Sequence, residues 1–238
     1  MIVYGKNPVI EALRSGKDIE KVLVAHDSHP PHQVVKLCKE RGIKIQKVPR
    51  IRIEQLAGTK KTQGIIALIS PISYVDPGEL FKTAVDKNSF ILVLDHLTDP
   101  QNVGNLIRTC EVFGGVGVLL PTHRSSPINE VVIKASAGSI FHLKLSRVSS
   151  LSKTLREFKK LGGWIVAVER GGKDIRNVSI PLPSALVLGS EGEGISKSIA
   201  EISDIIVSIP MVGKINSLNV GSAGAIAMWE CVRNKVRI

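Results

Sequence analysis

Short apolar runs alternate with amphipathic segments along the first 70 residues of the chain. Apolar positions spaced three and four apart predict helices, and compact runs rich in β-branched residues predict strands. On this pattern we expect helices at 9–16, 33–42 and 51–58, and strands at 21–26, 43–48 and 64–70. These elements indicate a small α/β domain over residues 1–70.

The stretch PISYVDPGE (71–79) interrupts this alternation, and its Pro and Gly residues are typical of a linker. Over residues 80–238 the alternation resumes with longer strands that are apolar almost throughout, expected at 90–95, 116–121, 164–169, 184–190 and 205–210. Such runs with helices between them predict a parallel sheet covered on both faces. The fold class is therefore expected to be α/β in both domains.

Three of the predicted strands are followed by unusual loops. These read DPQNVGNLIRTCEVFG (99–114), SEGEGI (190–195) and MVGKINSLNVGSAGAIAM (211–228). In open parallel sheets, ligands bind beyond the carboxyl ends of the strands, where loops and helix N-termini meet. The three loops are therefore the candidate functional segments.

Familiar nucleotide and metal motifs do not account for these segments. GSEGEG (189–194) has the wrong spacing for a Rossmann fingerprint, and AVERGGKD around Lys173 fails as a P-loop. His26, His29 and His32 are spaced three apart, but two prolines separate them and no Cys or acidic cluster supports a metal site. We expect no metal. A GxSxG motif is absent, which disfavours a hydrolase.

Cysteine usage and hydropathy bear on the compartment. Cys38, Cys110 and Cys231 occur singly and far apart, which favours a reduced, cytoplasmic environment over a disulfide framework. The first residues lack an apolar core long enough for a signal peptide, and no window approaches a membrane span. A soluble, untargeted protein with no membrane partner is expected.

The charge balance points to a polyanionic partner. The chain has 238 residues, with 32 Lys and Arg against 21 Asp and Glu, a net charge of +11. Residues 1–75 hold 13 basic and 6 acidic side chains, so the first third carries most of the excess. This predicts RNA contacts in the N-terminal domain. The candidate RNA-binding residues are Lys6, Arg50, Arg52, Lys60 and Lys61.

Taken together and in this order, the three loops resemble the motifs of the SpoU (TrmH) family of RNA ribose 2′-O-methyltransferases, within the SPOUT class. YGKNPVIEAL (4–13) and QGI (63–65) make the first 70 residues similar to the RNA-binding domain of members close to the large-subunit ribosomal RNA guanosine methyltransferase. The resemblance implies a C-terminal SPOUT domain with a deep trefoil knot, a homodimer, and S-adenosylmethionine held in the knot. The implied cofactor-binding residues are Leu188, Gly189, Ile209, Met211 and Leu218.

The resemblance also implies the catalytic residues Asn102, Arg108, Glu191, Ser217 and Asn219. The family gives the central role to the arginine six residues after the first motif's asparagine, here Arg108 after Asn102. A guanidinium stays protonated to above about pH 12, so we favour Arg108 as a clamp on the target's phosphate, with a role as base left open. Asn102 would bind substrate or cap its helix.

The remaining implied residues lie in the second and third of the three loops. Glu191 is expected to accept hydrogen bonds from Arg108 or from loop amides. Ser217 and Asn219 are expected near the cofactor and the target ribose, although Asn219 could instead be an N-cap of the last helix. The sulfonium carries its own leaving group, so methyl transfer needs no metal.

Three functions compete at this stage. The primary expectation is methylation of a ribose 2′-hydroxyl in ribosomal RNA, a guanosine of the large subunit by resemblance. The same motifs serve a tRNA ribose methyltransferase, which is the first alternative. A non-catalytic RNA-binding or ribosome-assembly protein is the second alternative, and the intact set of catalytic residues disfavours it.

Overall fold

A computed structural model describes residues 1–215 and 217–233, and the chain forms two compact units. The first unit comprises Met1–Ile72 and Ile128–His142, and the second comprises Ser73–Pro127 and the chain from Leu143 onward. The domain limits 1–70 and 80–238 stay a prediction. Residues 128–142 pack with the first unit, a feature that the hydropathic pattern did not indicate.

The first unit is built on a mixed four-stranded sheet in the order β1-β4-β2-β3. The antiparallel pairs β1–β4 and β4–β2 are followed by the parallel pair β2–β3. The strands are β1 (Ile2–Tyr4), β2 (Ile19–Ala25), β3 (Ile45–Val48) and β4 (Ile65–Ile69). The helices are α1 (Lys6–Arg14), α2 (His32–Glu40), α3 (Arg50–Ala57) and α6 (Glu130–Ala135), with a short 3₁₀ turn at Ser139–His142.

One face of this sheet packs against α3. Ile53 is fully buried and lies in a cluster with Leu23 of β2 and Ile66 of β4. Gly58 ends α3 in the left-handed conformation, with φ at 62°. The predicted helices and strands of this region are all present, and β1 is an additional edge strand too short to be recognised from periodicity.

The second unit contains a six-stranded parallel sheet in the order β10-β8-β9-β5-β6-β7. Its strands are β5 (Phe90–Asp95), β6 (Gly117–Pro121), β7 (Lys144–Val148), β8 (Trp164–Asp174), β9 (Ser184–Gly189) and β10 (Ile205–Ser208). Its helices are α4 (Pro77–Asp86), α5 (Pro100–Val112), α7 (Leu151–Lys160), α8 (Lys197–Ala200) and α9 (Val220–Val232), with a 3₁₀ turn at Ile175–Asn177. The predicted parallel α/β fold is confirmed, and the trefoil knot stays a prediction.

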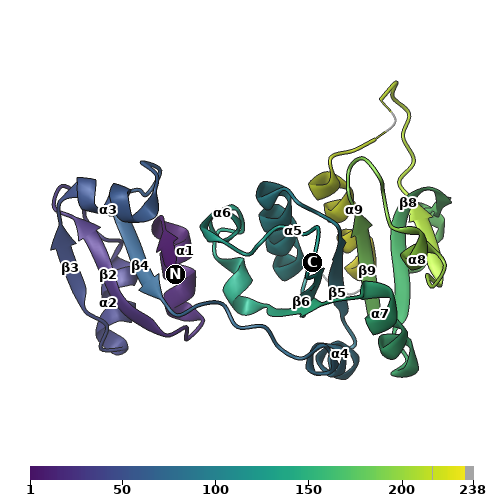
Figure 1. Cartoon of the computed structure of the whole chain (residues 1–238), viewed down its shortest axis with the longest axis horizontal. Helices are drawn as coiled ribbons and strands as arrows, with labels where there is room; N and C mark the ends of the chain where they lie inside the picture. The colour runs from purple at the N-terminus through teal and green to yellow at the C-terminus, as the bar shows by residue number, and fades with distance from the viewer. Residues whose placement is uncertain (216, 234–238) are drawn as a thin grey trace. The chain divides into compact units, whose positions relative to one another are not determined.

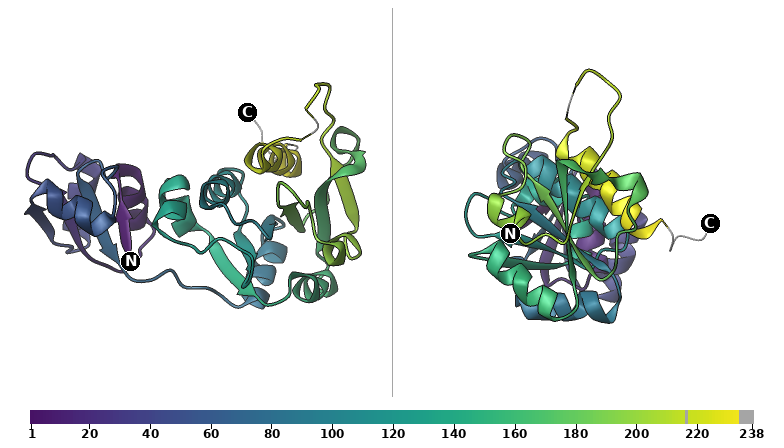
Figure 2. Two further views of the ribbon diagram at one scale, coloured as in Figure 1. Left: turned by 45° about the horizontal axis from the view of Figure 1, so that its top comes forward. Right: turned by 90° about the vertical axis from the view of Figure 1, so that its right-hand side faces the viewer.

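Helices cover both faces of this sheet, with α5 and α9 on one side and α4 and α7 on the other (Figures 1 and 2). On the α4 and α7 side, Phe81 and Phe158 are buried with ring centroids 5.0 Å apart. On the other side α9 packs closely on α5, because a Cβ added to Gly224 would lie 2.3 Å from Leu106 Cδ2 and 2.7 Å from Leu188 Cδ1. The glycine therefore permits this close approach.

Three local expectations need correction. Residues 77–79 belong to α4 rather than to a linker, because Asp76 caps the helix through the Gly78 N–H and Pro77 suits its first turn. The segment that begins DPQNVG, expected as a loop after the strand at 90–95, forms a helix from Pro100 onward, because Asp99 caps it. β7 was not predicted, since KLSRV alternates polar and apolar residues instead of forming an apolar run.

Substituting Phe158→Ala should reduce the free energy of unfolding by about 3–5 kcal/mol, because the fully buried ring leaves a cavity beside Phe81. Chemical denaturation of the two proteins measures this difference. Leu161→Ala is the control, and it should change stability by less than about 1 kcal/mol because Leu161 is 52% exposed. Equal losses for the two variants would contradict the assigned core.

Candidate active site

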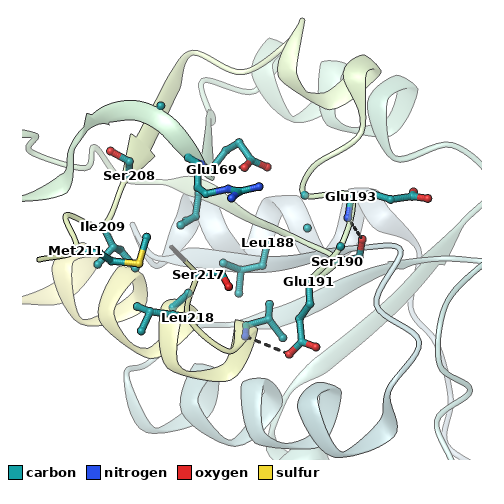
Figure 3. Close-up of a pocket in the computed structure, with 18 of the residues that line it drawn as sticks. Glu169, Leu188, Ser190, Glu191, Glu193, Ser208, Ile209, Met211, Ser217 and Leu218 are labelled. Atoms are coloured by element: carbon teal, nitrogen blue, oxygen red, sulfur yellow. Dashed lines mark hydrogen bonds between the residues drawn. The ribbon is translucent and has the colours of Figure 1, made fainter. Parts of the chain in front are cut away.

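A cavity of about 660 Å³ lies at the ends of β9 and β10 and beside residues 168–171 within β8 (Figure 3). Its lining combines apolar side chains with carboxylates and backbone of the SEGEGI loop. The residues that line it are Val168, Glu169, Arg170, Gly171, Leu188, Gly189, Ser190, Glu191, Gly192, Glu193, Gly194, Ser208, Ile209, Met211, Gly213, Ile215, Ser217, Leu218, Val220 and Ala223. Its size and mixed character are typical of small-molecule sites.

The loop after β9 closes on itself at the cavity wall. Ser190 and Gly194 exchange backbone hydrogen bonds of 3.1 and 2.9 Å. A Cβ on Gly189 would lie 2.1 Å from the carbonyl carbon of Gly194, so only glycine fits at the end of this strand. The glycines thus allow a tight turn that presents Glu191 at its tip.

The loop after β5 starts α5 beside that turn. Asp99 accepts hydrogen bonds from the backbone N–H groups of Gln101 and Asn102, at 3.3 and 2.9 Å. The helix is therefore capped by Asp99, and the side chain of Asn102 is free for another role. Of the two alternatives for Asn102, the cap is therefore supplied by Asp99, and substrate binding stays a prediction.

The Glu191 carboxylate joins the three motifs. Its Oε1 accepts hydrogen bonds from Asn102 Nδ2 at 3.1 Å and from Asn219 Nδ2 at 2.8 Å. Asn219 Nδ2 also donates to Asn102 Oδ1 at 3.0 Å, and the Val220 N–H lies 3.5 Å from Glu191 Oε1. Residues from positions 102, 191 and 219 thus form one hydrogen-bonded network at the cavity rim.

Asn219 also caps α9, since its Oδ1 accepts a hydrogen bond from the Gly221 N–H at 2.9 Å. The N-cap that the sequence raised as an alternative is therefore present, and a place for Asn219 near the cofactor and the target ribose stays a prediction. The amide oxygen stabilises the helix, while the amide nitrogen donates to the Asn102 and Glu191 side chains.

Arg108 lies in α5 two turns after the helix start, with its side chain exposed. Among the described residues it makes no hydrogen bond or ion pair, and Glu191 takes its hydrogen bonds from the two asparagines and the Val220 amide instead. The guanidinium donors of Arg108 are therefore uncommitted within the described part of the chain, and its role stays a prediction.

The predicted cofactor residues gather at one place. All five, namely Leu188, Gly189, Ile209, Met211 and Leu218, line the cavity, as do Glu191 and Ser217. Asn102 and Asn219 do not line the cavity, but both donate hydrogen bonds to Glu191, which does. Arg108 lies outside the lining as well. The roles assigned to these residues stay predictions.

Sequence reasoning missed Glu169 and Arg170, which line the same cavity. They sit on β8 where its pairing with β10 breaks, because Ile206 pairs with Ala167 and Val207 with Lys173. The intervening residues bulge out of the ladder. The sequence does contain a signal for these two residues, because they follow the apolar run of the strand predicted at 164–169, where ligands of parallel sheets bind.

The five candidate RNA-binding residues all belong to the first unit. Arg52, Lys60 and Lys61 are exposed, and so is Lys6, whose backbone N–H donates to Gln63 Oε1 at 2.8 Å. Arg50 differs, since its Nε donates to Asp27 Oδ2 at 2.8 Å and its Nη2 donates to Ser28 Oγ. Some of the hydrogen-bond donors of the Arg50 guanidinium are therefore already used within the first unit.

The thiols are unsuited to nucleophilic chemistry. All three cysteines are free and buried. Burial raises the pKa of Cys110, and raises the pKa of Cys231 to about 12, so both thiols stay protonated at neutral pH. Within residues 1–215 and 217–233, no group of three or more His, Cys, Asp or Glu could hold a metal ion, and no helix is long and apolar enough to cross a membrane.

A parallel α/β sheet with a mixed cavity at its carboxyl edge and a polar network at the rim defines a ligand-binding enzyme domain. Sequence comparison identifies which one. The model of the SpoU rRNA Methylase family matches residues 89–229, and that of the RNA 2′-O ribose methyltransferase substrate-binding domain matches residues 2–75. A putative TrmH family tRNA/rRNA methyltransferase of Bacillus subtilis is 38% identical over 238 residues, which cover 98% of this chain and 95% of the relative.

The chain therefore belongs to the SpoU (TrmH) family of RNA methyltransferases. The predicted family, enzyme class and methyl donor are confirmed at this level: it is an S-adenosylmethionine-dependent RNA methyltransferase.

Solved structures agree with the fold. A putative RNA methyltransferase of the TrmH family from Porphyromonas gingivalis has a TM-score of 0.78 at 26% identity, covering 98% of this chain and 89% of that chain. The SpoU methyltransferase AviRb from Streptomyces viridochromogenes, in complex with AdoMet, has a TM-score of 0.82 at 22% identity, covering 99% and 90%. At that identity, AviRb supports the fold alone.

Removing the Asn219 side chain should destabilise the protein, because α9 loses its cap and Glu191 loses a donor. Asn219→Ala is expected to reduce the free energy of unfolding by about 0.5–2 kcal/mol, measured by chemical denaturation. Glu201→Ala changes an exposed side chain after α8 and serves as the control. If the Asn219→Ala protein were as stable as this control, the Asn219 side chain would contribute nothing to stability, either as the cap of α9 or as a donor to Glu191.

Proposed function

We propose that this protein transfers a methyl group from S-adenosylmethionine to a ribose 2′-hydroxyl of RNA, with ribosomal RNA as substrate. The observation that carries the proposal is the hydrogen-bonded network of Asn102, Glu191 and Asn219 at the cavity rim. It brings together three loops that are far apart in sequence, which a simple binding scaffold would not require. The description of the substrate-binding family model, which names 2′-O ribose methylation, agrees with this reaction.

The lining of the cavity suits the methyl donor. Leu188, Ile209 and Leu218 offer apolar surface for an adenine ring, and Met211 adds a polarisable side chain. Glu193 and Arg170 supply both signs of charge, which complement the ammonium, sulfonium and carboxylate of the donor. When bound, the cofactor supplies an activated methyl group on its sulfonium.

The chain's own residues would position the RNA against that methyl group. Arg108 would bind the phosphate next to the target ribose, since its five N–H donors are uncommitted among the described residues. Asn102, held by Glu191, would orient the ribose hydroxyl. Positioning of this kind can lower the activation barrier by roughly 7–11 kcal/mol. A general base typically accelerates a reaction by ~10²–10⁴-fold, which is a smaller effect because each tenfold in rate is worth about 1.4 kcal/mol.

The first unit would supply the grip on RNA. The description of the methylase family model, which names rRNA, favours ribosomal RNA, and the resemblance of the first unit favours a guanosine of the large subunit. The name of the Bacillus subtilis relative covers both tRNA and rRNA, so tRNA is the second candidate substrate. We further propose that the protein acts as a homodimer in the cytoplasm.

Replacing Arg108 with alanine should lower the rate of methyl transfer to RNA by about 100-fold, because the target would lose its phosphate anchor and shift relative to the methyl donor. Arg108→Lys should recover part of the rate, since an ammonium still binds phosphate without the planar fork. Incorporation of tritiated methyl groups into ribosomal RNA and tRNA measures both effects.

Arg156→Ala is the matched control, because Arg156 is another exposed arginine of the second unit, on α7. It should methylate at the wild-type rate. Label on tRNA alone would defeat ribosomal RNA as substrate. No incorporation into any RNA by the wild-type protein would leave the non-catalytic alternative.

The affinity for RNA should fall steeply with salt, because each phosphate neutralised on a single strand adds about 0.7 to the log–log slope. Lys60→Ala/Lys61→Ala should lower that slope by about 1.4, measured by fluorescence anisotropy over a salt series. Lys39→Ala/Lys44→Ala removes two exposed lysines from elsewhere in the first unit and should leave the slope unchanged. A slope that responds equally to both pairs would refute the assigned surface.

A further inference from the structure

Two carboxylates, from the strands on either side of β9, hold the loop that carries Glu191. We propose that Asp95 and Glu169, here called the carboxylate clamp, are positioning residues that keep residues 189–196 in the conformation that cofactor binding and methyl transfer need. This inference rests on the proposed function, and it extends it to residues outside the three motif loops. Neither residue needs to touch the RNA.

Glu169 makes the first half of the carboxylate clamp. Its Oε2 accepts a hydrogen bond from the Ile195 N–H at 2.9 Å, and its Oε1 accepts one from the Arg170 N–H at 2.8 Å. The first bond reaches from the bulge of β8 across to the loop after β9. The second bond fixes the direction of the carboxylate, so both oxygens are used by backbone donors.

Asp95 makes the second half. It is the last residue of β5, pairs with Gly189 of β9, and is 1% exposed. Its Oδ2 accepts a hydrogen bond from the Ser196 N–H at 2.7 Å. Its Oδ1 is also buried and lies 2.6 Å from His96 Nδ1, without a hydrogen-bond partner in the described part of the chain. Ile195 and Ser196 are adjacent, so the two carboxylates bind consecutive amides from opposite sides of β9.

The fit around Gly194 couples the carboxylate clamp to the turn. Gly194 has φ at +68°, and a Cβ there would lie 2.0 Å from Glu169 Oε2. The Glu169 carboxylate therefore fills the space that any larger residue at 194 would need. Since Gly194 closes the turn through its two backbone bonds with Ser190, fixing Ile195 also fixes the base of the turn.

The position of Glu191 depends on where the two ends of this turn are held. Glu191 is exposed at the tip of the turn, and its Oε1 alone receives the Asn102 and Asn219 side chains. The turn's own bonds, Ser190 to Gly194 and the Glu193 N–H to Ser190 Oγ, hold its shape but not its place on the sheet. The carboxylate clamp supplies that placement, and charged acceptors make the stronger class of hydrogen bond.

The test of Glu169 uses Glu169→Gln, which keeps the size of the side chain but leaves one acceptor oxygen for two N–H donors. We expect kcat to fall by about 10-fold or more and the calorimetric Kd for S-adenosylmethionine to rise by about 5-fold or more, since small misplacements at a reacting centre are costly. KM for RNA should stay within about 2-fold, because the first unit supplies the grip. Glu201→Gln, the same change at an exposed site, should match the wild type.

A double-mutant cycle separates positioning from general destabilisation. If Glu169 acts through Glu191, the loss of kcat caused by Glu169→Gln should largely disappear in a Glu191→Gln background. Additive losses would overturn the proposal, and so would a Glu169→Gln enzyme indistinguishable from Glu201→Gln.

The Asp95 arm uses a pair of variants. Asp95→Asn retains an oxygen that can accept from Ser196, whereas Asp95→Ala has none, so Asp95→Asn should lose clearly less activity than Asp95→Ala. Equal losses would remove Asp95 from the carboxylate clamp.

A measurement on the wild-type protein covers the case in which variants fail to fold. The amide protons of Ile195 and Ser196 should exchange more slowly than those of Glu191 and Gly192, for which residues 1–215 and 217–233 offer no such acceptor. Equal exchange rates would overturn the proposal. Failure of the proposed function itself would be seen differently, as a wild-type protein that neither binds S-adenosylmethionine nor methylates RNA.

Discussion

The pairing of β5 with β9 is the constraint on which the site depends. Phe90 to Asp95 run parallel to Ser184 to Gly189 without a register shift, so Asp95 and Gly189 end side by side. Both strands are buried almost throughout, and the apolar burial that holds them together also fixes where their following loops begin. Asn102 and Glu191 meet because the two loops leave the sheet from adjacent points. The chemistry at the rim is thus a consequence of packing in the centre of the sheet.

Much of this architecture could be predicted from the sequence because apolar runs are a strong local signal. FILVLD and SALVLG are apolar and bounded by polar turns, and both form central strands. KLSRV has no such contrast and forms an edge strand. The start of α5 depended on one hydrogen-bond acceptor, Asp99, whose role is visible only when its backbone partners are placed. Local chemistry of this kind shifts boundaries by a few residues.

The site divides in the same way. Residues carried by the family motifs, such as Gly189, Glu191 and Asn219, could be named from sequence, and they lie around one cavity or its rim. The partners of Glu191 could not, since the sequence favoured Arg108 or loop amides and the donors are mainly two asparagines. Glu169 belongs to no motif, and its position at the cavity arises from the break in β8 pairing, a three-dimensional feature. Sequence patterns identify chemical groups, whereas their contacts require the assembled sheet.

The order of the strands has a consequence for how this chain acquires its structure. β9 lies between β5 and β8, although both are made before it. A nascent chain that has emerged as far as residue 174 therefore has two apolar strand edges that must remain separate until Ser184–Gly189 arrives. Such late insertion of a central strand requires long-range pairing, which slows folding. Until β9 is inserted, the unpaired strand edges stay exposed and are prone to aggregation. The unpaired edges of β5 and β8 would therefore need protection from aggregation during translation, a requirement that the folded enzyme no longer has.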